Sequence, residues 1–231
     1  TGARLVARGT RRRPLSVVLP LSPSCQPASE LGMTQNSPIP LTDGAPAADV
    51  YRRRCKQAIY RRVRDTIWRM RNPEDMAELL AEIRRSLEEL GVPLMFCGVN
   101  VVDTAVEPPQ MISHSINPKG EQHRLLSVGA GTAMRFWENG EVVYRRDLAR
   151  DDPYDESRHF RGIACIVDVP FSHGTLAVSS DRPHAFADDD VQVLEEMALL
   201  LEDGFRRLEE LTQLDAQHRL REQVWRMRHK D

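Results

Sequence analysis

Cysteine is the first residue type in this chain to consider for chemistry, and its spacing limits what that chemistry can be. Cys25, Cys55, Cys97 and Cys165 are scattered, with no CxxC or CxxH pair. This argues against a zinc site or a disulfide framework and favours a reducing compartment such as the cytoplasm. Cys97 and Cys165 lie in apolar segments, which suit small buried side chains better than reactive thiolates.

Histidine is the second candidate, and here the sequence favours one position. His159 lies in the loop "DESRHFRG", just before the most strongly predicted strand. Imidazole can bind haem iron or another metal, although a single histidine in a polar loop is more often solvated. The chain has no paired metal-ligand spacing, nucleophile motif or glycine-rich phosphate loop. The sequence therefore identifies no catalytic residue and no cofactor.

The elements that position these residues follow from the apolar periods. Apolar residues recur every four positions in 47–72 and at helical spacing in 76–90, and a long helix is predicted from Asp188 onward. A short helix runs through Phe136 and Trp137. Strand patterns cover five segments: 93–103, 123–128, 141–146, 161–171 and 173–180. This order predicts an α+β fold, with an antiparallel sheet covered by helices on one side.

Residues 168–211 resemble the second half of a GAF domain. In that family a strand enters Val-Pro, a glycine-bearing turn leads into a strand of small residues, and P-x-x-F precedes an acidic cap and a long helix. The matching positions here are Val169-Pro170, Gly174, 176–179, Pro183 with Phe186, and 188–190. The resemblance spans about 73–212. It implies a six-stranded antiparallel sheet, a pocket on one face, and pairing through the terminal helices.

The chain therefore divides into four predicted parts. Residues 1–46 are rich in Pro, Ser, Thr, Gly and Ala, have no helical or strand period, and are expected to be disordered. Residues 47–72 form a basic connecting helix, 73–212 form the GAF domain, and 213–231 form a second connecting helix. No apolar run is long enough to span a bilayer.

The resemblance also predicts where a small molecule would bind. An aromatic-lined cavity with a few polar groups is expected on one face of the sheet. Its predicted lining is Phe96, Asn100, Phe136, Trp137, Tyr154, His159, Phe160, Arg161 and Cys165. The alternative is that the aromatic side chains fill the core and leave no cavity. The sequence does not name a ligand, so the cofactor stays unknown.

The phrase "WRMR" occurs at Trp68 and again at Trp225, and the residues around it repeat as well. Residues 62–71 match 219–228 at a constant offset, with four Arg–Arg pairs and otherwise identical or similar residues apart from one. The spacing has the size of one helix plus one GAF-like domain. We therefore expect the final helix to begin a second repeat within a longer signalling protein.

The leading functional hypothesis is a non-catalytic sensory module of the kind found in bacterial sensor kinases and related two-component regulators. A homodimer would form through the terminal helices, and the long helix would carry a signal to an output domain. The residues predicted to pair these helices are Ile59, Val63, Ile67, Leu201, Phe205 and Leu208.

Two other functions stay open at this point. One is a small redox enzyme of the methionine sulfoxide reductase type, which would use Cys97 and Cys165. The other is a nucleic-acid-binding regulator, because residues 51–71 carry nine Arg or Lys against one acid, Asp65, although the whole chain has a net charge of -2. The segment has no recognition motif. We favour a solvated helix exterior whose cations face acids of another helix, namely Glu209, Glu210, Asp215 and Glu222.

Overall fold

The computed structural model describes residues 44–71, 75–128 and 131–228. The chain forms two units, 1–48 and 49–231, and the fold described below is that of the second. The predicted disorder of 1–46 falls almost wholly outside the described residues. The part that is described, 44–46, is helical, so the first helix begins three residues earlier than predicted.

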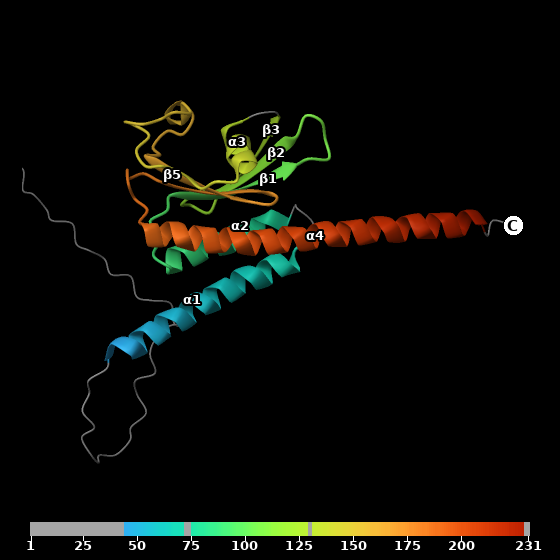
Figure 1. Cartoon of the computed structure of the whole chain (residues 1–231), viewed down its shortest axis with the longest axis horizontal. Helices are drawn as coiled ribbons and strands as arrows, with labels where there is room; N and C mark the ends of the chain where they lie inside the picture. Colours follow the sequence, from blue (N-terminus) through green and yellow to red (C-terminus); the bar gives the residue numbers. More distant parts are fainter. Residues whose placement is uncertain (1–43, 72–74, 129–130, 229–231) are drawn as a thin grey trace, which may run out of the picture. The chain divides into compact units, whose positions relative to one another are not determined.

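Three α-helices lie along one face of the fold (Figure 1). They are α1 (Gly44–Arg69), α2 (Met76–Glu89) and α4 (Asp188–Arg228). The apolar periods predicted all three to within a few residues. No described helix has the length and apolar character needed to cross a membrane. The other face carries α3 (Thr132–Asn139) and the short 3-10 helix η3 (Glu156–Arg158).

A sheet of six antiparallel strands forms the middle layer, as the family resemblance implied. The strands are β1 (Phe96–Asp103), β2 (Gln110–Ile116), β3 (Gln122–Val128), β4 (Val143–Arg145), β5 (Cys165–Phe171) and β6 (Gly174–Ser180). Their order in the sheet is β3-β2-β1-β6-β5-β4. The predicted α+β class, with helices over an antiparallel sheet, is therefore confirmed.

Strand β2 is the element that the sequence pattern missed. Its sequence, "QMISHSI", places Ser113 and Ser115 where a half-buried strand would normally show apolar residues on one face. These serines face a cavity instead of a packed core, so the usual alternation of apolar and polar residues is absent. Backbone pairing with β1 on one side and β3 on the other holds the strand in place.

The main apolar core lies between the sheet and the three helices. The stripe of α1 and the buried residues of α2 and α4 pack in one cluster with the near face of β1, β5 and β6. This cluster contains all the residues that were predicted to join two chains: Ile59, Val63, Ile67, Leu201, Phe205 and Leu208. Because the chain buries them in its own core, their assignment to a dimer face is corrected. A homodimer stays a prediction that light scattering can check, but it needs other residues.

Gly174 fits a position where β6 meets β1 too closely for a side chain. A Cβ atom there would overlap the backbone oxygen of Asn100 and lie 2.8 Å from its carbonyl carbon. Backbone atoms cannot rotate away, so we expect Gly174→Ala to lower the free energy of unfolding by about 2 kcal/mol, measured by urea denaturation. Gly131→Ala is the control, since its Cβ would meet no atom within 4 Å. Equal stability of the two variants would contradict this account.

Candidate functional site

The face of the sheet that turns away from α1, α2 and α4 has a floor of small residues. The strand register places Gly98 between Ser115 on β2 and Ala177 on β6, and it places Ala177 beside Asp168 on β5. Ser113 pairs with Asn100 in the same layer. Small side chains in neighbouring positions leave space above the sheet.

That space is a cavity of about 720 Å³, within the usual size range of small-molecule pockets. Small and polar residues of β1, β2, β5 and β6 form its floor, and residues from α3, η3 and the loop after η3 complete the walls. Six of the residues predicted from the sequence line it: Phe96, Asn100, Tyr154, His159, Phe160 and Arg161. The binding of a small molecule in this cavity stays a prediction.

Three of the predicted residues do not line this cavity. Cys165 is on the opposite face of β5 and is buried in the core with the helices. Phe136 is buried behind the cavity wall, where its ring contacts Tyr154 edge-on at 5.0 Å between centroids and lies under Arg145 at 4.7 Å. Phe136 therefore supports two lining residues from behind.

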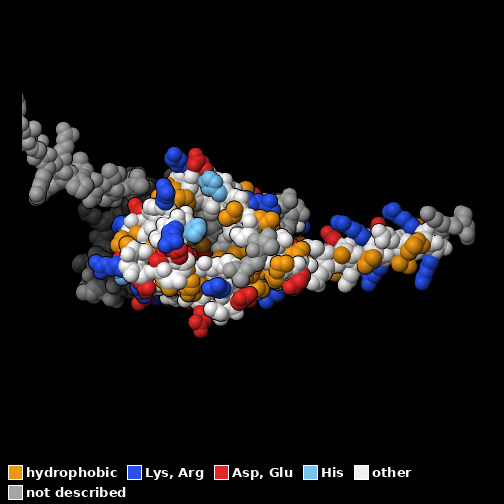
Figure 2. Space-filling view, turned by 90° about the horizontal axis from the view of Figure 1, so that it is seen from above, with side chains coloured by type: hydrophobic (Ala, Val, Ile, Leu, Met, Phe, Trp, Pro, Cys, Tyr) orange, Lys and Arg blue, Asp and Glu red, His pale blue; other side chains and the backbone are white. Residues whose placement is uncertain are grey.

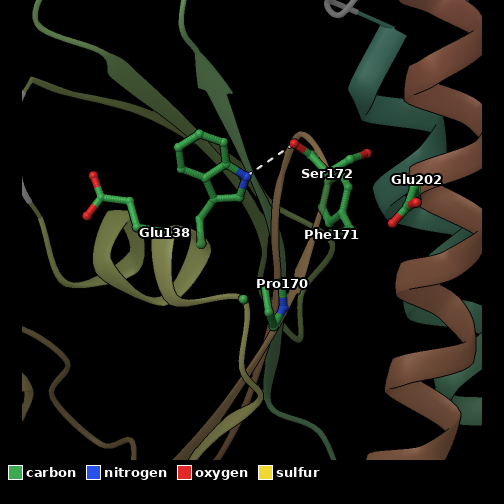
Figure 3. A pocket seen from close by; sticks show the side chains of 7 residues that line it. Glu138, Pro170, Phe171, Ser172 and Glu202 are labelled. Carbon is green, nitrogen blue, oxygen red and sulfur yellow. Dashed lines mark hydrogen bonds between the residues drawn. The ribbon is translucent and has the colours of Figure 1, made fainter.

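Trp137 belongs to a different hollow, between α3, α4 and the turn that joins β5 to β6 (Figure 3). Its indole Nε1 donates a hydrogen bond to the backbone oxygen of Ser172 at 3.2 Å. Glu138 and Glu202 face the same hollow from the two helices. The tryptophan thus ties α3 to the β5–β6 turn and takes no part in the larger cavity.

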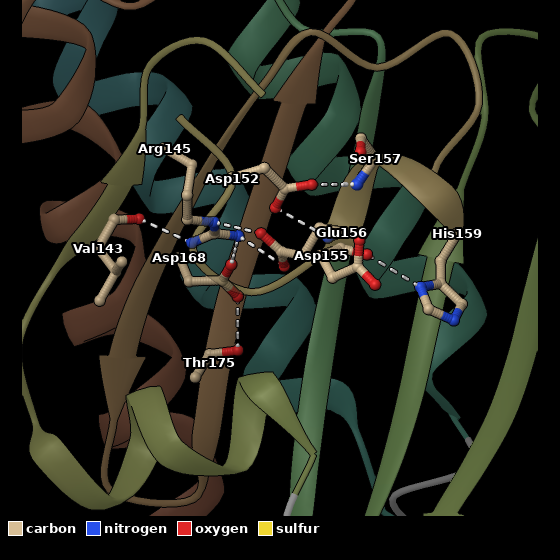
Figure 4. A network of polar contacts seen from close by, with 9 residues as sticks. All are labelled: Val143, Arg145, Asp152, Asp155, Glu156, Ser157, His159, Asp168 and Thr175. Atoms are coloured by element: carbon tan, nitrogen blue, oxygen red, sulfur yellow. Dashed lines mark hydrogen bonds and ion pairs between the residues drawn. The ribbon is translucent and has the colours of Figure 1, made fainter. Parts of the chain in front are cut away.

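A buried network of charged and polar side chains forms one wall of the large cavity (Figure 4). Arg145 Nε donates to Glu156 Oε2 at 2.7 Å, and Arg145 Nη2 donates to Asp168 Oδ2 at 2.6 Å. Asp168 Oδ1 accepts from the hydroxyl of Thr175 at 3.1 Å, and that hydroxyl accepts from the amide of Asn100 at 2.8 Å. All five side chains belong to buried residues.

Two carboxyl groups share one guanidinium in this network. Burial raises the pKa of Glu156, the charge of Arg145 opposes this effect, and the nearby Asp168 adds to it. Arg145 Nη1 donates to the backbone oxygen of Val143 at 3.0 Å, and the other two nitrogens of the guanidinium donate to the carboxylates. The guanidinium of Arg145 is therefore fully engaged, whereas the carboxylate oxygens of Glu156 and Asp168 keep further lone pairs for a hydrogen-bond donor.

Sequence reasoning did not select Arg145, Glu156 or Asp168, but one signal was present. Asp168 sits in the middle of the apolar strand "CIVDVPF", and a charge at such a position requires a buried partner. Nothing in the sequence shows which cation supplies it. Arg145 becomes that partner only because β4 pairs with β5 at the sheet edge.

Cys97 and Cys165 are poorly suited to redox chemistry at this cavity. Burial raises the pKa of Cys97 to about 12 and also raises that of Cys165. The thiolate, which is the reactive form, is therefore strongly disfavoured at both residues. Among the residues that the structure describes, no group of three or more His, Cys, Asp or Glu side chains is placed to hold a metal ion.

Basic residues of α1 form ion pairs with glutamates of α2 and α4. Lys56 lies 2.9 Å from Glu196, and Arg62 bridges Glu82 at 3.0 Å and Glu89 at 2.8 Å. Acids of other helices therefore face these cations, as expected, but they are not the predicted Glu209, Glu210, Asp215 and Glu222. The nucleic-acid hypothesis gains no further support from it.

No protein-family model matches the sequence, and no match was found among curated proteins. Solved structures are similar in fold. The GAF domain of a phosphoenolpyruvate-protein phosphotransferase from Coxiella burnetii is 16% identical, over 68% of this chain and 96% of that one, with a TM-score of 0.51. The corresponding Acinetobacter domain is 14% identical, over 67% and 95%, with a TM-score of 0.50.

A free methionine-R-sulfoxide reductase from Neisseria meningitidis is 16% identical, over 67% of this chain and 90% of that one, with a TM-score of 0.49. At identities this low, a likeness to solved structures concerns the fold alone. The two GAF domains above have TM-scores of 0.50 and 0.51 to this chain, which shows that they share its fold. The chain therefore contains a domain of the GAF fold.

Proposed function

We propose that this chain is a sensory module that binds a small polar molecule in the 720 Å³ cavity and transmits binding to α4. The observation that carries the proposal is the buried network of Arg145, Glu156 and Asp168 in the cavity wall. Buried charges are costly, and residues that merely fill a core could be apolar at no loss of stability. A binding role accounts for charges at this place.

The chemistry of the wall favours a ligand that donates hydrogen bonds. Glu156 and Asp168 provide oxygens, while the single guanidinium between them is already engaged. The serine-lined floor adds hydroxyl groups, and Tyr154 and Phe160 add aromatic surface. An amine or amidine on a small polar body would donate to these carboxylate oxygens and pack against the aromatic walls.

A route from the cavity to α4 runs through the β5–β6 hairpin. Phe171 follows the cavity-lining part of β5, and its ring lies 5.6 Å from that of Phe205 on α4. In the adjacent turn, His173 Nε2 lies 3.2 Å from Glu209 Oε2, also on α4. A shift of β5 on ligand binding would therefore bias the position of α4, which is the proposed output. We place the module in the cytoplasm because its described cysteines are free thiols.

The cavity can be tested by filling it. Ala177 lies in the floor beside Asp168, and a phenylalanine there would occupy the space that a ligand needs. A panel of small amines, amidines, carboxylates and purines would be screened by thermal shift. A binder present at about a hundred times its Kd should raise Tm by about 5–10 °C. Ala177→Phe should abolish the shift while the protein stays folded.

Leu126→Phe is the matched control, because Leu126 is exposed and does not line the cavity. This variant should keep the full thermal shift. Native mass spectrometry of the purified chain adds a search for a retained molecule. The proposal fails if no compound binds and no bound mass is found, or if binding persists in Ala177→Phe.

The redox and nucleic-acid alternatives are not proposed here. The first would use Cys97 and Cys165, and both are buried with raised pKa values. The second has no feature on α1 beyond cations, of which Lys56, Arg62 and Arg69 pair with glutamates.

A further inference from the structure

The C-terminal part of α4 presents an apolar stripe to solvent. Leu220, Val224 and Met227 lie at i, i+4 and i+7, so they share one face of the helix, and they are 61%, 43% and 69% exposed. Figure 2 shows apolar side chains between arginines along this part of the helix. An exposed apolar stripe of this kind marks a surface that binds another element.

A similar sequence occurs in α1, where its apolar residues are buried. Val63, Ile67 and Met70 match Leu220, Val224 and Met227 at the constant offset of the repeat. Their exposures are 0%, 0% and 2%, because they pack in the core with α2 and α4. The structure thus contains a binding site for this type of helix, formed by α2 and α4, which we call the seat. In this chain α1 occupies it.

Charged residues of α2 contribute to that seat as well, because they form ion pairs with arginines of α1. Arg62 contacts Glu82 and Glu89 of α2, and Arg69 contacts Glu78 at 2.7 Å.

The tryptophan of the repeat makes a further contact at the same seat. Trp68 lies under the guanidinium of Arg207 on α4, at 5.1 Å. In the second copy of the repeat, Arg219 and Arg226 correspond to Arg62 and Arg69. Trp225 corresponds to Trp68.

We propose that residues 219–228 dock into the α1-type seat of a second GAF-like domain, one whose α2-type helix carries glutamates beside an apolar groove. Charge favours this occupant over a second copy of the same helix. Residues 219–228 hold four arginines against Glu222, so two such helices side by side would repel each other. The proposal does not depend on ligand binding in the cavity.

The test extends the full chain after Asp231 with a second copy of residues 75–212, which continues the offset of the repeat. The added copy brings the seat but no α1 of its own. We expect it to fold, and we expect the amides of 219–228 to exchange with solvent at least about 100-fold more slowly than in the parent chain. A second tandem protein, whose added copy spans 44–212, shows that the copy folds when it has its own α1.

Two charge reversals separate docking from general effects. Arg219→Glu removes the counterpart of Arg62 and should lower the protection of 219–228 by about tenfold or more. Arg221→Glu makes the same change at the counterpart of Arg64, which is exposed in α1, and should leave the protection unchanged.

Three results would overturn the proposal. One is an added copy that folds only with its own α1, and another is equal loss of protection in the two variants. The third is protection of 219–228 in the parent chain that rises with its concentration, because this would show pairing of the helix with a second copy.

Discussion

Replacing Arg145 by methionine should lower the free energy of unfolding by about 3–5 kcal/mol at pH 7, the largest effect that we expect from a single substitution in this chain. The guanidinium is the partner of both Glu156 and Asp168 in a buried wall. Methionine fills similar space but leaves two buried carboxyl groups without their cation. The measurement is urea denaturation of the variant beside the parent chain.

The loss should shrink as the pH falls. Burial already raises the pKa of Glu156, and without Arg145 that pKa rises further. In the window between the unfolded and the folded pKa, the folded variant binds more protons than the unfolded chain. Its stability therefore increases relative to the parent as pH decreases from 7 toward 5. A pH-independent loss would show that packing, and not charge, sets the effect.

The neighbouring residue supplies a matched control. Arg146 is exposed and stacks on Tyr144 at 4.4 Å, so Arg146→Met should cost less than about 1 kcal/mol. Adding Glu156→Gln and Asp168→Asn to Arg145→Met should recover much of the lost stability, because the buried groups are then neutral. If the Arg145 and Arg146 variants are equally stable, the network does not contribute to the free energy of unfolding.

The second large effect is expected at Gly204, where α4 crosses α1. A Cβ atom at this residue would overlap Cγ2 of Ile67, which is fully buried. Valine has a better helix propensity than glycine, but it cannot fit unless α1 moves away. We expect Gly204→Val to cost about 3 kcal/mol in urea denaturation and to speed hydrogen exchange in α1.

The contact can be isolated by a compensating change. Ile67→Ala should restore part of the stability of Gly204→Val, although alone it destabilises the parent chain, so the double-mutant cycle should show favourable coupling. Ala216→Val, on the exposed part of α4, controls for the propensity of valine and should cost about 0.5 kcal/mol or less. Additive effects of the two core substitutions would argue against the close crossing.

Much of this fold could be predicted because its elements carry local signals. The period of α1 and α2, the short helix through Phe136 and Trp137 and the small-residue strand β6 were all found close to their true positions. The GAF resemblance rested on Pro170, Gly174 and the acidic start of α4, where the backbone requires particular residue types. Strand β2 had no such signal, because Ser113 and Ser115 face a cavity.

The candidate site was only half predictable. Residues on the loop after η3, such as His159 and Arg161, were placed correctly at the cavity by analogy with the fold. The sequence put Cys165 with them, but the register of β5 turns it toward the helices. The network of Arg145, Glu156 and Asp168 was missed, since it joins β4, β5 and η3 across the sheet edge.

By itself, the sequence determined the helices, most of the strands and the repeat, because each depends on residues that are neighbours along the chain. The tertiary structure decided which apolar stripe is internal and which is exposed. Val63 and Leu220 have nearly the same neighbours in sequence, yet one is buried and the other is in solvent. Burial depends on what lies across from a helix, and only the packing of α2 and α4 provides that surface.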